Sequence, residues 1–121
     1  MNIKQIMIAA SIAFAGISAG TAQAHAKLLS SQPQASSTLD SAPKAIRLQF
    51  NEALEAAFSK ITLSDGNNKE IVLPKVQLDK ADSKAMLATV PVLSAGKYHV
   101  KWSTLTHDGH KTKGEFDFTV K

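Results

Sequence analysis

Alternation of apolar and polar residues along the chain predicts short, half-buried β-strands. In the three clearest segments the apolar residues occupy every second position: Ile46, Leu48 and Phe50; Tyr98, Val100 and Trp102; and Phe116, Phe118 and Val120. Side chains two residues apart point to the same face of a strand, so each segment presents one face to a core. Further strands are predicted at residues 27–31, 59–63, 70–73 and 84–90.

Turn-forming residues separate the predicted strands and indicate the fold class. Segments such as Ser64-Asp65-Gly66-Asn67 and Ser94-Ala95-Gly96, together with four prolines, lie between them. About seven short strands with this spacing are typical of an all-β Greek-key sandwich or barrel. Residues 51–57 have a helix-forming composition and are expected to form a turn or two of helix. Residues 38–43 are expected to form a loop.

The first 24 residues have the pattern of a cleaved secretory signal peptide. Lys4 provides a positive charge, residues 6–17 are largely apolar, and Ala22-Gln23-Ala24 forms an A-x-A cleavage site. The apolar segment is shorter than the roughly 20 residues that span a membrane, and no second candidate follows it. We therefore expect an exported protein whose mature chain, residues 25–121, is a single domain without membrane insertion.

Composition excludes several functional classes. The chain has no cysteine, which excludes thiolate zinc sites, thiol nucleophiles and the thiolate-bound blue-copper centre. Its formal net charge is +4, but the lysines are scattered, so a nucleic-acid partner is not expected. Ser103, His107 and Asp108 lie too close in the sequence for a triad, whose members converge from separate segments. We expect a protein that is not an enzyme.

Cleavage after Ala24 would make His25 the first residue of the mature chain. Its α-amine and imidazole can then close a chelate ring on one metal ion, which no internal histidine can do. Asp108 and His110 lie two residues apart between predicted strands, so in extended backbone their side chains share one side. The intervening His107 points the other way and is expected to be exposed. One amine, two imidazoles and one carboxylate form a nitrogen/oxygen set that favours Cu(II).

The remaining histidine and the methionines are not expected to be metal ligands. His99 alternates with the inward-facing Tyr98 and Val100 and is expected to face solvent, outside the metal site. Two of the three methionines belong to the predicted signal, and Met86 belongs to a predicted strand. A thioether-rich Cu(I) site is therefore not expected.

Several motifs along the mature chain resemble the CopC family of periplasmic copper-binding proteins, including its YobA-like members. The matching segments are His25-Ala26-Lys27-Leu28, Ile46-Arg47-Leu48-Gln49-Phe50-Asn51-Glu52, Tyr98-His99-Val100-Lys101-Trp102, Asp108-Gly109-His110 and the Gly114-x-Phe116-x-Phe118-x-Val120 strand. The methionine-rich segment of some family members is absent here. The resemblance implies an immunoglobulin-like Greek-key sandwich or barrel of seven strands.

For function, the resemblance implies one Cu(II) ion per chain, held by His25, Asp108 and His110. By position it places Glu52 near the site, where that carboxylate would orient an imidazole. His107 departs from the family pattern and remains an alternative ligand. The expected role is copper sequestration, or delivery to an inner-membrane copper importer or another periplasmic copper protein, by a monomer in the periplasm.

Two other functions stay open at this point. A chelating N-terminal histidine with a second histidine also occurs in copper-dependent polysaccharide monooxygenases, although one Trp and one Tyr leave little for an aromatic sugar-binding face. A sandwich domain can also be a metal-free structural or adhesion module, since fold does not determine function.

Overall fold

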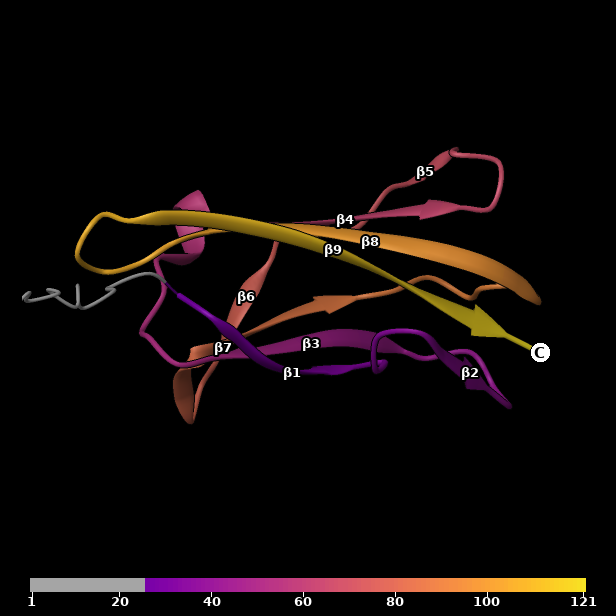
Figure 1. Cartoon of the computed structure of the whole chain (residues 1–121), viewed down its shortest axis with the longest axis horizontal. Coiled ribbons are helices and arrows are strands. Elements are labelled where there is room, and N and C mark those ends of the chain that lie inside the picture. Colours follow the sequence, from indigo (N-terminus) through magenta and orange to yellow (C-terminus); the bar gives the residue numbers. More distant parts are fainter. Residues whose placement is uncertain (1–25) are drawn as a thin grey trace, which may run out of the picture.

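The computed structural model describes residues 26–121, which form two β-sheets packed face to face (Figure 1). The four-stranded sheet has the order β1–β3–β7–β6 and contains β1 (Leu28–Gln32), β3 (Ala45–Phe50), β7 (Asp82–Thr89) and β6 (Gln77–Asp79). The five-stranded sheet has the order β2–β9–β8–β4–β5 and contains β2 (Ser37–Leu39), β9 (Lys111–Val120), β8 (Gly96–Leu105), β4 (Lys60–Asp65) and β5 (Glu70–Ile71). The all-β sandwich predicted from the alternation pattern is confirmed.

The core lies between the sheets and is lined by the residues that the alternation placed inward. Those with at most 8% exposure include Ile46, Leu48, Phe50, Tyr98, Val100, Trp102, Phe118 and Val120. The ring of Phe50 meets Trp102 edge to face with centroids 5.0 Å apart, and Tyr98 stacks on Phe118 at 5.4 Å. Such aromatic pairs contribute about 0.5–1.5 kcal/mol beyond their buried area. They join the two sheets at Phe50–Trp102 and join neighbouring strands at Tyr98–Phe118.

Strand β9 leaves room for the indole of Trp102 only because it carries a glycine. Gly114 lies directly opposite Trp102 in the β8–β9 pairing. A Cβ atom on Gly114 would lie 2.5 Å from Cζ2 and 2.7 Å from Cε2 of that ring. A glycine within a strand often marks such a close approach. The position therefore cannot accept a side chain unless the indole moves.

Two short strands lie where the sequence pattern predicted none. Strand β2 falls partly in the expected loop at residues 38–43 and pairs in parallel with the end of β9, placing Leu39 opposite Val120. Strand β6 pairs with β7. Each has three residues, too few to show a period of two. The described chain thus has nine strands rather than about seven.

The prediction of a helix at residues 51–57 is wrong. The segment forms an isolated bridge at Leu54 and a single 3₁₀ turn, η1 (Ala56–Phe58). Its backbone bonds to other strands, since the Leu54 N–H donates to Ser83 O at 3.1 Å and the Glu55 N–H donates to Leu105 O at 2.9 Å. Tertiary pairing therefore overrides local helix propensity. No helix among residues 26–121 is long and apolar enough to cross a membrane.

Candidate metal centre

The β8–β9 connection, residues 106–110, is a tight turn at one end of the sandwich (Figure 1). The Thr106 N–H donates to His110 O, and the Gly109 N–H donates to Thr106 O, each at 2.9 Å. Gly109 has a φ of +94°, a backbone conformation that glycine adopts without steric cost. The turn therefore has a defined shape, with Asp108 at its tip.

One buried hydroxyl organises both predicted ligands of this turn. Thr106 is 1% exposed. Its Oγ1 donates to Asp108 Oδ1 at 2.6 Å and accepts the His110 N–H at 3.0 Å. A buried hydroxyl held by two such bonds has little freedom to rotate. It therefore fixes the position of Asp108 relative to His110.

Asp108 and His110 lie side by side, with Asp108 Oδ1 3.2 Å from His110 Nδ1. Their side chains are 51% and 45% exposed, so a solvated ion can reach both. The Thr106 hydroxyl, and after it His110, lower the pKa of the Asp108 carboxyl. That carboxylate is therefore ionised at neutral pH. The two residues meet as expected, but through the turn and not through extended backbone.

The first described residues are fixed beside this turn. Thr112 Oγ1, two residues beyond His110, donates to Ala26 O at 3.1 Å, and Ala26 is 5% exposed. The next residue is held as well, since the Lys27 N–H donates to Asn51 Oδ1 at 2.7 Å and the Asn51 N–H donates to Lys27 O at 3.2 Å. The chain therefore enters the sandwich at the end that carries Asp108 and His110.

The segment between β3 and β4 lies along the other side of the turn. Leu54 forms a bridge with Thr106, and the His107 N–H donates to Ala53 O at 3.1 Å. The His107 side chain is 79% exposed, as predicted, and its Nδ1 lies 2.5 Å from Glu55 Oε2. Sequence reasoning missed Glu55, although it is a second carboxylate in the segment that carries Glu52.

Neither Glu52 nor His107 joins the Asp108–His110 pair among the hydrogen bonds and ion pairs described for residues 26–121. Glu52 is half-buried in the bend before Ala53, and His107 binds Glu55. His25 lies outside the described residues. Within residues 26–121 no group of three or more histidine or acidic side chains is placed to hold a metal ion. The described chain thus supplies two adjacent donors, the His110 imidazole and the Asp108 carboxylate.

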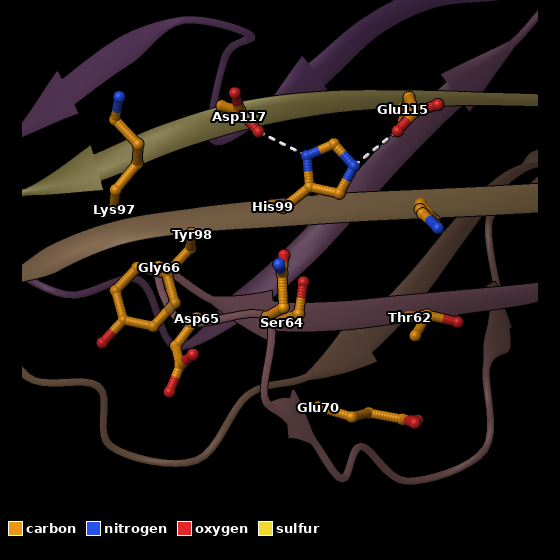
Figure 2. Close-up of a pocket in the computed structure, with 12 residues that line it drawn as sticks. Thr62, Ser64, Asp65, Gly66, Glu70, Lys97, Tyr98, His99, Glu115 and Asp117 are labelled. Atoms are coloured by element: carbon orange, nitrogen blue, oxygen red, sulfur yellow. Dashed lines mark hydrogen bonds and ion pairs between the residues drawn. The ribbon is translucent and has the colours of Figure 1, made fainter.

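A separate histidine cluster lies on the outer face of the five-stranded sheet (Figure 2). His99 projects between two carboxylates of β9, its Nδ1 bonded to Asp117 Oδ1 and its Nε2 2.5 Å from Glu115 Oε1. Its side chain is 32% exposed, so it faces outward as predicted but is covered by its partners. Leu105 lies six positions after His99 in β8, a distance of about 20 Å along the strand. The cluster is therefore distinct from the turn.

The stability of the sandwich should depend on the protonation of His99. Asp117, and after it Glu115, raise the pKa of the imidazole above its ordinary value despite its partial burial. These carboxylates stabilise the charged imidazole. Their contribution to the free energy of unfolding is therefore fully present below about pH 6.5. It is lost as the pH rises through the raised pKa. In urea unfolding, the advantage of the native chain over His99→Gln is expected to be larger at pH 6 than at pH 9. An advantage independent of pH would contradict this.

Comparison with known proteins gives consistent matches. A family model for the CopC domain matches residues 28–121. Protein YobA of Escherichia coli (strain K12) is 37% identical over 101 residues, covering 81% of this chain and 80% of YobA.

Two solved structures share the fold. The crystal structure of CopC from Methylosinus trichosporium OB3b superposes with a TM-score of 0.76 at 30% identity, covering 80% of this chain and 94% of that one. PcoC from Escherichia coli, a methionine-rich copper resistance protein, superposes with a TM-score of 0.73 at 36% identity, covering 81% and 100%. The present chain has three methionines in all, and Met86 is fully buried.

Proposed function

The chain belongs to the CopC family of copper-handling proteins, and we propose that it holds one Cu(II) ion in the periplasm through its mature N-terminus. The ligands are the α-amine and imidazole of His25, the carboxylate of Asp108 and the imidazole of His110. The protein binds copper as cargo, for sequestration or for exchange with another copper protein, and is not an enzyme. The observation that carries this proposal is the side-by-side placement of Asp108 and His110 next to the point where the chain enters the sandwich.

The fixed position of Ala26 supports His25 as the other ligand. Consecutive Cα atoms are 3.8 Å apart, so residue 25 begins within one residue of a backbone bonded to Thr112. Thr112 itself follows His110 by two residues in β9. Ala26, to which residue 25 is joined, is therefore held near the pair that the proposed ligand would complete.

The chemistry of the donors favours the oxidised ion. Imidazole, amine and carboxylate suit Cu(II), whereas Cu(I) prefers thiolates and thioethers, and the chain has no cysteine. Reduction would then weaken binding and offer a route to release. Acid would also release the ion, because the amine and imidazoles bind only when unprotonated. The Glu55–His107 pair, bonded beside the turn, would hold His107 away from the ion.

The proposal is tested by Cu(II) titration of two matched forms, one beginning at His25 and one retaining Ala24. The His25 form is expected to bind one equivalent with a tetragonal nitrogen/oxygen electron paramagnetic resonance spectrum. The Ala24 form should bind at least about 100-fold more weakly, because a terminal amine one residue away no longer closes the same ring.

Equal affinity of the two forms would place the ligands elsewhere, with His107 and His110 the next candidates. Absence of binding by both forms would refute the copper site and leave the metal-free module. Thermal unfolding gives an independent measure, since a ligand at a thousand times its dissociation constant stabilises the native state by about 4 kcal/mol.

A further inference from the structure

Phe58 is a large apolar side chain exposed at the same end of the sandwich as the candidate metal centre. It ends η1 and is 69% exposed. Its N–H donates to Glu55 O at 3.1 Å, and the Glu55 side chain contacts His107 of the turn. Single exposed apolar side chains are common on protein surfaces, so Phe58 indicates a binding surface only together with the groups around it. One short segment thus joins Phe58 to the turn.

Four exposed lysines lie on the outer face of the five-stranded sheet, and three of them, Lys60, Lys111 and Lys113, line the hollows beside Phe58. Lys60 of β4 and Lys113 of β9 both lie opposite Ser103 of β8, one on each side. Lys101 lies two residues before Ser103, and Lys111 directly follows His110. We call Phe58 and these four lysines the Phe58 patch.

The lysines of the Phe58 patch form no ion pair within the described chain. Among residues 26–121 the ion pairs involve Arg47, Lys121 and three histidines, and none involves a lysine of the Phe58 patch. Glu115, which borders the patch, is engaged by His99. Lysines that share one face of a sheet without ion-pair partners attract an acidic surface, which lowers the repulsion among their charges when it binds.

The surface around Phe58 is hollowed on two sides. One hollow of about 440 Å³ is lined by Phe58, Ser103, Lys111 and Lys113. Another of about 560 Å³ lies between Phe58 and the segment after β5, which carries Val72 with 83% exposure. Phe58 therefore stands as a ridge between two depressions that another protein can fill.

We propose that the Phe58 patch is the docking surface for the protein that exchanges copper with this chain. This partner carries carboxylates that face the four lysines and an apolar recess that receives the Phe58 ring. The inference rests on the proposed copper function, because it makes the patch the place where the second copper protein binds. Docking there brings the partner beside Lys111, the residue that follows the predicted ligand His110.

The surface shape of the patch favours a protein partner over a lipid membrane. Membrane-binding surfaces insert several apolar side chains into a bilayer, whereas the described chain exposes four large ones, of which only Val72 borders the same hollow as Phe58. They are Leu29, Phe58, Val72 and Val92, and Leu29 lies on the other sheet. One ring among lysines, flanked by hollows, resembles the anchor residue of a protein interface.

The test is photocrosslinking in living cells of the source species. Phe58 of the full precursor is replaced by p-benzoylphenylalanine, and the matched control carries it at Val92, which is 99% exposed. Illumination is expected to give one dominant protein adduct from position 58, with the crosslinked segment of the partner rich in Asp and Glu. Position 92 should not give this adduct.

The role of the lysines in docking is then tested by charge reversal. Lys60→Glu with Lys113→Glu should lower the adduct yield roughly tenfold, whereas the matched reversal of the exposed Lys44 and Lys80 should leave it unchanged. Reversal of the crosslinked acidic residues of the partner to lysine should restore the yield. Cu(II) affinity measured on the same variants should stay constant, so failure of docking is distinguished from failure of the copper site.

Three results would overturn the proposal. One is the absence of a specific adduct at position 58, and another is an adduct that survives both charge reversals. The third is sedimentation of the mature chain with phosphatidylglycerol vesicles but not phosphatidylcholine vesicles, lost in Phe58→Ala, which would assign the patch to a membrane. Crosslinking in copper-depleted medium should give the same adduct, because docking relies on charge and shape and not on the ion.

Discussion

Substitution of Gly114 by alanine is expected to destabilise the sandwich by about 1–3 kcal/mol. The added methyl group would lie 2.5 Å from the Trp102 ring, and the indole cannot retreat easily because Phe50 packs edge to face against it. In a domain of this size the loss corresponds to a decrease in Tm of about 4–8 °C per kcal/mol. Thermal and urea unfolding of the metal-free mature chain measure it.

Gly66→Ala is the matched control for this substitution. A Cβ atom at Gly66 meets nothing nearer than Lys97 O at 3.5 Å, an ordinary contact, so the same change should be neutral or slightly stabilising. Trp102→Phe removes part of the ring that the methyl group strikes. Gly114→Ala should therefore cost less in that background than in the native chain. Equal costs at positions 114 and 66 would refute the steric account.

Loss of either described donor is expected to abolish tight copper binding. His110→Ala and Asp108→Asn should each weaken Cu(II) affinity by more than about 100-fold, the upper end of what substitutions behind the ligands cost. Asp108→Asn keeps the size of the side chain and its bond to Thr106, but removes the charge that the ion needs. Competition with a chelator of known affinity measures the loss, and the spectrum of any residual complex should show altered coordination.

Two other histidines provide the controls. His99→Gln changes an imidazole bonded to Glu115 and Asp117 on the outer face of the sheet, so Cu(II) affinity should stay within about threefold of native. His107→Ala separates the alternatives for the turn. Unchanged affinity would agree with the bond from His107 to Glu55, whereas a loss equal to that of His110→Ala would make His107 a ligand.

The strands with strict alternation could be predicted from sequence, and the short or irregular elements could not. Strands β3, β8 and β9 have six or ten residues, long enough for a period of two to appear. Strand β2 has three residues, and its place is set by parallel pairing with β9, a contact between distant segments. Residues 51–57 have helical propensity, but bonds to Ser83 and Leu105 decide their conformation.

For the candidate site, residue types were easier to predict than their arrangement. The presence of an aspartate and a histidine in one turn between strands made Asp108 and His110 candidate ligands. Their actual contact depends on the Thr106 hydroxyl, which the sequence does not distinguish from other strand threonines. The carboxylate that contacts His107 of the turn is Glu55, which the sequence pattern did not distinguish, whereas the role of Glu52 stays a prediction.

The shortness of the edge strands bears on the tendency of this protein to aggregate. Strands β2 and β6 have three residues and β5 has two, so three of the four sheet edges in the described chain offer few free backbone groups. Long, flat edges are templates on which other chains add and aggregate. A chain that has no cysteine, and so no disulfide to lock it, passes through partly open states on every unfolding event. Because its edge strands are short, those states offer few free backbone groups to which other chains could add.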